Sequence, residues 1–310
     1  MTSTPPEPVD DPREDSSHAS QAHDSTGRIG PPAGRLWGTQ TALSLQFFAI
    51  GEQRMPIDII HALGWIKWAA ACVHEELRLQ PPALAAAIAA AAEQVATGAW
   101  DAEFPLSVWQ TGSGTQSHMN VNEVIAALAT QSLAPGAQAG VTVHPNDDVN
   151  LGQSSNDVFP TAMHLAVTLN ARAALLPTLD ELLATLTAKT EAFAAVIKTG
   201  RTHLQDATPV TLGQEFGGYT AQLLLCRQSL LTALDGVHAL AIGGTAVGTG
   251  LNTHPEFAQR VVAKLALRLG LPLRQADNLF AAMAGHEALV AFHGALRMLA
   301  IALNKIANDI

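Results

Sequence analysis

Charged residues and cysteines are scarce in this 310-residue sequence. Only 14% of the residues are charged and 48% are hydrophobic, which excludes disorder for most of the chain. The 17 Lys and Arg are outnumbered by 27 Asp and Glu and form no basic stripe, so we expect no nucleic-acid partner. Cys72 and Cys226 lie far apart, which argues against a disulfide framework or a zinc site and favours a reducing cytoplasm.

Long apolar runs are also missing, and the first 30 residues contain almost no large apolar side chains. No stretch of about 18 strongly apolar residues is present, so we expect no membrane partner. Residues 1–30 are rich in Pro, Ser, Asp and Glu, unlike the apolar core of a secretory signal or an Arg-rich transit peptide. We therefore expect residues 1–30 to be a disordered acidic extension of a cytoplasmic protein.

Helical signals dominate the remaining sequence. Pro56 suits the first turn of a helix that runs through Leu77, and the Ala-rich segment 82–97 predicts a second helix closed by Gly98. Alternating β-branched residues are nearly absent, so strands should be few and short. The predicted fold is mainly α, with an N-terminal helical domain over residues 31–150 followed by an elongated central long-helix bundle over residues 151–310.

Three series of apolar residues support the bundle, because they recur in steps of three and four over several turns. They run from Leu176 to Ile197, with a kink expected at Pro177, from Leu212 to Leu240, and from Leu289 to Ile310. The last series, in a helix expected over residues 279–310, reaches the final residue without a Gly, Pro or C-cap. We therefore expect the C-terminal part of the bundle to be missing from this sequence.

Four polar loops interrupt the helices and are the candidate sites. Residues 111–116 place glycines before a helix, where backbone N–H groups favour an anion, although an ordinary helix start explains them as well. Residues 143–150 contain His144, Asp147 and Asp148 without a recognised metal-binding spacing, so no metal is expected. Residues 153–157 offer hydroxyl and amide groups beyond the needs of one helix cap.

The fourth loop, residues 200–207, contains His203, which suits proton transfer near neutral pH, with Asp206 or a glutamate elsewhere to orient it. A fifth, glycine-rich loop at residues 243–250 follows a helical pattern and lacks the dinucleotide-binding spacing. Together these residues favour acid–base chemistry on a small anion without a cofactor. They do not identify the anion.

Taken in order, these five loops resemble class II fumarate hydratase. The resemblance is carried by Trp109–Gln116 with Met119 and Asn120, by residues 144–150, by residues 153–162, by residues 200–207 and by residues 243–250. It runs from about Leu36 to Ile310 and implies the fumarase/aspartase-like fold, with reversible addition of water to fumarate to give (S)-malate. It also implies a homotetramer whose active sites each combine three subunits.

The resemblance assigns roles to individual residues. His203 is similar to the catalytic histidine, which exchanges a proton with water on the C2 oxygen side. The positions similar to the dicarboxylate-binding residues are Ser113, Gly114, Thr115, Ser154, Ser155, Asn156 and Thr202. The positions similar to a second, non-catalytic anion site are His144, Pro145, Asn146 and Asp147. A basic residue that usually precedes that second site is replaced by Val141.

The sequence also departs from the family at its end. The Gly-Ser-Ser-Met-Pro-Lys-Asn pattern of the family's flexible loop, which carries the serine base, is absent from these 310 residues. The resemblance thus implies that this chain alone is inactive. Two alternatives stay open: an aspartate ammonia-lyase-type enzyme of the same fold, and an inactive truncated bundle acting as a structural subunit. His203 and Asp148 favour water, because the ammonia-lyases typically have Gln and His at these positions.

Overall fold

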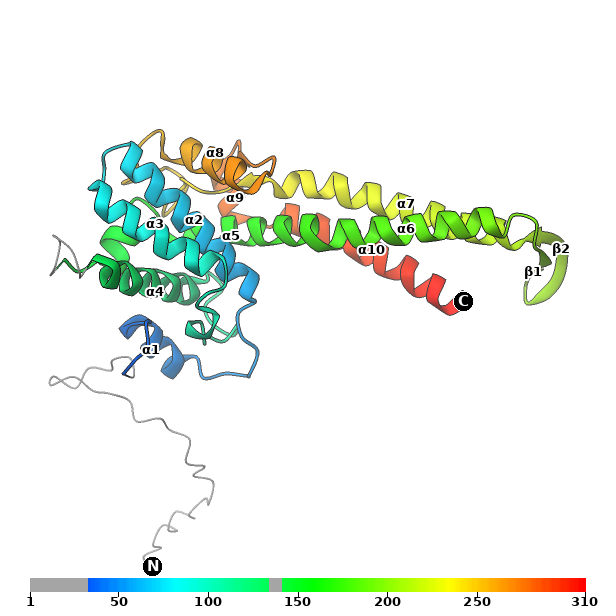
Figure 1. The fold of residues 1–310 in the computed structure, drawn as a ribbon, viewed down its shortest axis with the longest axis horizontal. Coiled ribbons are helices and arrows are strands. Elements are labelled where there is room, and N and C mark those ends of the chain that lie inside the picture. The colour runs from blue at the N-terminus through cyan, green and yellow to red at the C-terminus, as the bar shows by residue number, and fades with distance from the viewer. Residues whose placement is uncertain (1–32, 134–140) are drawn as a thin grey trace, which may run out of the picture.

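The computed structural model describes residues 33–133 and 141–310, so the extension predicted at residues 1–30 lies outside it. Figure 1 shows a compact body at one end and a long rod of helices that projects from it. The compact body contains α1 (Thr39–Phe47), α2 (Ile57–Glu76), α3 (Pro82–Ala96), η1 (Asp101–Glu103), α4 (Thr115–Leu133), η2 (Pro145–Val149), α5 (Ser155–Asn170) and α8 (Phe257–Leu269). The rod contains η3 (Ala171–Leu175), α6 (Leu176–Ala192), β1 (Ile197–Thr202), β2 (Gln205–Thr211), α7 (Leu212–Val237) and α10 (Glu287–Asp309). The remaining elements are β3 (Ala239–Leu240), β4 (Arg274–Gln275) and α9 (Leu279–Ala284).

The first two predicted helices form where their end signals stand. Pro56 precedes α2, and Pro82 begins α3, whose end is marked by Gly98 with a φ of +83°. The two helices pack closely because Gly64 has no side chain. A Cβ atom at Gly64 would lie 2.6 Å from the backbone nitrogen of Ala96. The small residues of this pair therefore set how closely the helices approach.

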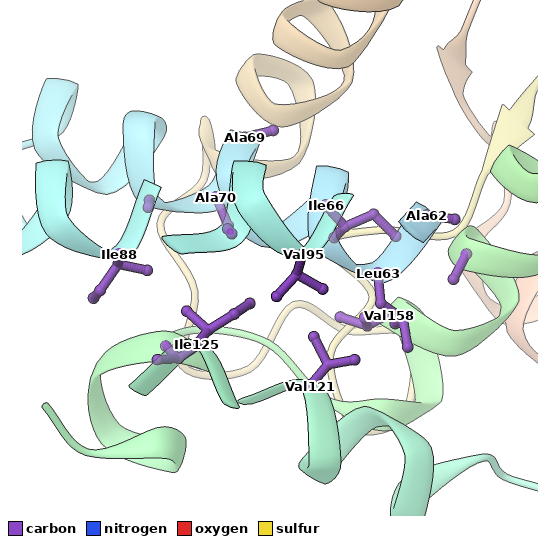
Figure 2. Close-up of a cluster of buried hydrophobic side chains, with 14 of the residues drawn as sticks. Ala62, Leu63, Ile66, Ala69, Ala70, Ile88, Val95, Val121, Ile125 and Val158 are labelled. Atoms are coloured by element: carbon purple, nitrogen blue, oxygen red, sulfur yellow. The ribbon is translucent and has the colours of Figure 1, made fainter. Parts of the chain in front are cut away.

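The compact body has a continuous apolar core, shown in Figure 2. Its side chains come from α2, α3, α4 and α5 and point toward one another; those labelled include Leu63, Ile66, Ile88, Val95, Val121, Ile125 and Val158. The same core includes Phe257 and Leu265 of α8. Helices α5 and α8 lie after residue 150, so this core contains residues from both sides of the predicted domain boundary.

The rod is held by a second core, in which α7 packs against both α6 and α10. The predicted apolar series supply it, with buried residues Leu176, Leu179, Leu183, Leu186, Tyr219, Leu223, Cys226, Leu230, Phe292, Leu299 and Ile306. The irregularity expected at Pro177 is a π-helical turn, η3, directly before α6. Proline has no N–H to donate to the preceding turn, which favours irregular backbone there.

The first series ends earlier than predicted. Helix α6 stops at Ala192, and Ile197 lies in β1 with 76% of its surface exposed. The segment 200–207, expected as a loop, is part of an antiparallel hairpin that pairs Ile197 with Thr211 and Thr202 with Gln205. Valine, isoleucine and threonine are frequent in residues 196–211, and β-branched side chains favour strands over helices.

The later series also need correction. Helix α7 ends at Val237, and Leu240 lies in β3, which pairs in parallel with β4. The helix predicted over residues 279–310 is two helices, α9 and α10, separated at Gly285 in extended conformation. Glycine is a poor helix former, so this position interrupts the helix at low cost.

Helix α10 is long and apolar but has little cover within the chain. Only 22% of its most apolar 18-residue window is buried, and Val290 and Ile301 are both more than 60% exposed. By length and composition alone the helix could cross a membrane. Length and composition do not distinguish such a span from a helix in a larger bundle, and α10 already packs along α7.

Candidate functional site

A pocket of about 540 Å³ lies where three of the five sequence motifs meet. Ser113 comes from the loop before α4, Ser155 and Asn156 come from the start of α5, and Val247 comes from the glycine-rich loop 243–250. The remaining wall is mainly apolar and includes Phe159, Met163, Phe280, Met283 and His286. The pocket therefore combines a polar rim of hydroxyl and amide groups with an apolar wall.

The first motif packs tightly against α5. Gly114 has a φ of +67°, and a Cβ atom there would lie 2.3 Å from the ring of Phe159. Glycine is thus needed for both the backbone conformation and the close approach. Next to it, the Ser113 hydroxyl lies 3.0 Å from the hydroxyls of Thr111 and Thr115. Gly114 and Thr115 accordingly shape and support the loop, while Ser113 lines the pocket.

The third motif caps α5 and anchors the glycine-rich loop. The Ser154 hydroxyl accepts from the Asn156 N–H, and the buried Asp157 carboxylate accepts from the Ser154 N–H in a capping box. The second oxygen of Asp157 accepts from the N–H groups of Gly243 and Thr245 at 2.9 and 3.0 Å. Burial raises the pKa of Asp157, and the three backbone donors oppose that rise. Asp157 therefore ties two motifs together.

Two side chains at the start of α5 face the pocket with defined partners. Asn156 donates its amide to the carbonyl of Ala246 at 2.8 Å. Ser155 Oγ lies 2.7 Å from Nδ1 of His118, a fully buried residue of α4. The N-terminus of α5 adds the positive end of the helix dipole, which favours an anion. These features suit recognition of a carboxylate.

Two buried polar residues behind the pocket, Lys67 and His118, were not singled out from the sequence. Lys67 donates to Oδ1 of Asn150 at 2.8 Å and to Oε1 of Gln153 at 3.0 Å. Burial lowers the pKa of Lys67 well below its usual range, while Asp157 opposes that change. A lysine or histidine among apolar helix residues, as in Ile66-Lys67-Trp68, is the signal that could have indicated them.

The second motif forms a self-contained turn on the compact body. The Asp147 N–H donates to Nδ1 of His144 at 3.0 Å, and the His144 N–H donates to the Asp148 carboxylate at 2.7 Å. His144, Asn146 and Asp147 are exposed, Pro145 is half-buried, and Val141 is exposed nearby in sequence. None of these residues lines the 540 Å³ pocket.

The fourth motif lies at the opposite end of the molecule. Figure 1 shows the β1–β2 hairpin at the tip of the rod, away from the compact body that holds the pocket. Thr202 and His203 are exposed there, and Asp206 pairs with Arg201 at 3.4 Å. Within the part of the chain that the structure describes, no hydrogen bond links Asp206 to His203. One chain therefore does not bring Thr202 and His203 to the predicted site residues on the compact body.

The hairpin turn itself is strained. His203 and Leu204 both have positive φ values, +49° and +61°, in a turn that glycine or asparagine normally occupies. Leu204 is 94% exposed. Strained backbone of this kind concentrates at functional sites. Across residues 33–133 and 141–310, no three His, Cys, Asp or Glu side chains gather as a possible metal site.

The sequence matches one protein family and several named relatives over most of its length. The family described as "Lyase" matches residues 27–310. The chain is 57% identical over 287 residues to a protein from Chromobacterium violaceum named fumarate hydratase class II, covering 93% of this chain and 62% of that protein. A relative of the same name from Methylorubrum extorquens is 56% identical, with 93% and 61% covered. The chain thus spans just over three fifths of the length of these curated relatives.

Solved structures show the same fold. The crystal structure of class II fumarase from Schistosoma mansoni superposes with a TM-score of 0.89 at 42% identity, covering 94% of this chain and 64% of that one. A fumarate lyase:delta crystallin structure from Brucella melitensis superposes with a TM-score of 0.83 at 37% identity, covering 94% and 63%. The mainly α fold expected from the sequence is confirmed. The family match over nearly the whole sequence makes this chain a member of the Lyase family.

Proposed function

We propose that this chain belongs to a class II fumarate hydratase, which reversibly adds water to fumarate to give (S)-malate. The observation that carries the proposal is the meeting of residues 111–116, 153–157 and 243–250 in one pocket with Ser113, Ser155 and Asn156 on its rim. The 57% identity to a protein named fumarate hydratase class II adds support. No cofactor is required by the proposed chemistry.

The pocket would hold one end of a small dicarboxylate. Hydroxyl and amide donors at Ser113, Ser155 and Asn156 suit carboxylate oxygens, and the α5 N-terminus adds a favourable dipole. Gly114, Thr115 and Ser154 would hold these groups in place. The residues 144–147 would form the second, non-catalytic anion site that the family resemblance implies. Its affinity is expected to be low, since Val141 supplies no positive charge.

His203 would act as the catalytic histidine, moving a proton at the C2 oxygen, with Thr202 as a further substrate contact. Because the hairpin lies far from the pocket of its own chain, we propose that it completes the pocket of another subunit in a homotetramer. The exposed Leu204 and the strained turn at His203 support an insertion of the hairpin tip into a neighbour. The exposed faces of α10 would be covered in the same assembly, in a reducing cytoplasm.

Extension of the chain tests the proposed activity. A chimera would join residues 1–310 to the C-terminal portion of the Chromobacterium violaceum relative that lies beyond the matched stretch. We expect this chimera to consume fumarate, followed by its ultraviolet absorbance, without added metal or nucleotide. Release of ammonia from aspartate without any action on malate would identify an ammonia-lyase and contradict the proposal.

The 310-residue chain alone should be inactive, because the serine base implied by the resemblance is absent from it. Assembly of this chain with a full-length relative supplies the matched control for the missing serine base. Co-expression with the full-length relative carrying a substitution of its own catalytic histidine should restore hydration, since His203 of this chain would meet the intact loop of the relative. Activity of the 310-residue chain by itself would contradict the assigned mechanism. A mixture that assembles but stays inactive would favour a structural subunit.

A further inference from the structure

His118 is a buried histidine whose ring reaches the candidate pocket through one hydrogen bond. It lies on α4 with no exposed surface, and its Nδ1 is 2.7 Å from Oγ of Ser155. Ser155 in turn lines the pocket. The other ring nitrogen, Nε2, is buried and has no hydrogen-bond partner in the described chain. The ring therefore has one polar contact, and that contact is a pocket hydroxyl.

The surroundings of His118 keep its ring neutral. Burial, together with the positive charge of Lys67, lowers the pKa of His118 well below 6.5. A neutral imidazole has one N–H donor and one acceptor nitrogen, so the ring can either donate to Ser155 or accept from it. A buried N–H without an acceptor is rarer in proteins than an under-used acceptor. An unpaired Nε2 thus favours the form with its proton on Nδ1.

The choice of tautomer decides what Ser155 can offer a ligand. A serine hydroxyl has a single proton. If Nδ1–H donates to Oγ, that proton is free to point into the pocket at a carboxylate oxygen. If Nδ1 carries no proton, it accepts a hydrogen bond from the Ser155 hydroxyl, and only oxygen lone pairs of Ser155 face the pocket. An anion would then meet repulsion instead of a donor.

We propose that His118 is a positioning residue that donates its Nδ1–H to Ser155 and so holds the Ser155 hydroxyl as a donor toward a bound carboxylate. The inference deepens the proposed function and rests on it, because it takes a dicarboxylate as the pocket ligand. His118 would not touch the substrate. Its effect would be on the strength and direction of one hydrogen bond from Ser155.

Nuclear magnetic resonance of the histidine rings tests this assignment directly. The 310-residue chain labelled with ¹⁵N-histidine, compared with its His118→Asn variant, identifies the His118 signals. We expect a neutral ring with the proton on Nδ1, both in the free chain and with succinate added as an unreactive dicarboxylate. A proton on Nε2, or a charged ring near pH 7, would overturn the proposal.

A matched pair of variants tests the consequence in the chimera. Asparagine can place an N–H near the position of Nδ1, whereas aspartate is similar in size and, when ionised, can only accept. His118→Asn should keep the KM for fumarate within about threefold. His118→Asp should raise it by roughly 10- to 100-fold, with a smaller change in kcat, since a donor to a charged ligand is lost. Equal KM values for the two variants would contradict the donor role.

Controls separate a positioning effect from damage to the fold. His118→Leu removes the hydrogen bond without adding an acceptor, so Ser155 loses its fixed orientation but keeps its proton free. It should raise KM by less than aspartate does while tryptophan fluorescence stays native. His61 is a partly exposed residue of α2 that pairs with Asp101, so His61→Asn should leave both KM and kcat unchanged. A wild-type chimera that ignores fumarate would be a failure of the proposed function. The tautomer in the free 310-residue chain would still decide whether His118 donates to Ser155.

Discussion

The compact body and the rod contain helices of similar length that differ in how much of their surface is buried. Eleven of the 20 residues of α2 are buried, against four of the 23 residues of α10. Helix α2 is covered by α3, α5 and α8, whereas α10 packs mainly along α7. The compact body thus covers most of α2 within one chain, while α10 in the rod presents an apolar face that this chain does not cover.

This difference also divides the candidate site. The pocket with Ser113, Ser155 and Asn156 is built on the well-covered body, where buried groups such as Asp157 fix its geometry. His203 stands on an exposed, strained hairpin at the tip of the rod. A pocket on the covered body and a histidine on a projecting hairpin would fit the proposed assembly, in which the hairpin of one copy completes the pocket of another.

The largest effect is expected at the tip of the rod. In the chimera, His203→Asn keeps a polar side chain but removes the titratable ring, so kcat should fall by roughly 10² to 10⁴, the usual contribution of a placed proton-transfer group. His144→Asn, on the compact body, should leave kcat within severalfold. Steady-state assays with fumarate measure kcat for both variants. Losses of equal size would mean that the two histidines cannot be assigned different roles.

Much of the rod could be predicted from its sequence because one periodic pattern governs it. Leu176, Leu179, Leu183 and Leu186 are all buried as their spacing required. The hairpin was missed, since Thr202-His203-Leu204-Gln205 lacks the Asn-Gly or Asp-Gly signal that normally marks such a turn. Strain is not visible in a residue pattern, so the most unusual part of the rod was also the least predictable.

The pocket was predicted in its residue types but not in its connections. Helix capping explained Ser154 and Asp157 locally, yet Asp157 also binds the N–H groups of Gly243 and Thr245. Contacts over 86 and 88 residues follow from tertiary packing and leave no local pattern. The separation of His203 from the pocket was likewise outside sequence reasoning, because spacing along a chain does not give distance in space.

A leucine-to-alanine pair compares the two cores. Leu63→Ala in α2 leaves a cavity among fully buried neighbours and should lower the free energy of unfolding by about 3 kcal/mol. Leu303→Ala, on a half-buried position of α10, should cost about 1 kcal/mol or less in the isolated chain. Tryptophan fluorescence in urea reports the compact body, which holds all five tryptophans.

The rod needs its own reporter, because it contains no tryptophan. Cys226 is buried in the α7 series, and its labelling rate in a Cys72→Ser background measures opening of the rod. Leu303→Ala should speed this labelling and leave the tryptophan transition unchanged. If Leu63→Ala and Leu303→Ala shifted both signals together, the two cores would unfold as one unit, and the comparison would fail.

Acid should weaken the compact body through His74. This ring stacks on Phe257 at 5.0 Å, and its burial lowers its pKa from 6.5 to about 4. At a pH between 4 and 6.5, His74 binds a proton in the unfolded chain but not in the folded chain. The contribution of His74 to stability is therefore fully present well above pH 6.5 and is lost as the pH falls through 6.5 toward 4. The expected loss is about 2 kcal/mol between pH 6.5 and pH 5.

The variant His74→Phe isolates that contribution. Phenylalanine keeps a ring against Phe257 and removes the titrating group, so the urea midpoint should vary less between pH 6.5 and pH 5 than in the parent chain. His118, whose pKa is also lowered, would leave a residual slope of the same sign. An unchanged slope in His74→Phe would show that other groups govern the acid sensitivity of the compact body.

A similarly small effect is expected at an arginine on the surface of the compact body. The guanidinium of Arg268 lies 5.3 and 5.6 Å from the rings of Trp65 and Trp68 and pairs with Glu93, so it links α8 to α2 and α3. The ion pair is exposed and is screened by salt, so the stacked guanidinium should dominate. Arg268→Ala should cost about 1 kcal/mol. Arg268→Lys retains the charge but lacks the planar group, and should recover less than half of that loss.

Urea midpoints in low and high salt, followed by tryptophan fluorescence, measure the stability of the Arg268→Ala and Arg268→Lys variants. Full recovery by lysine, or a loss that disappears in high salt, would mean that charge and not stacking joins these helices.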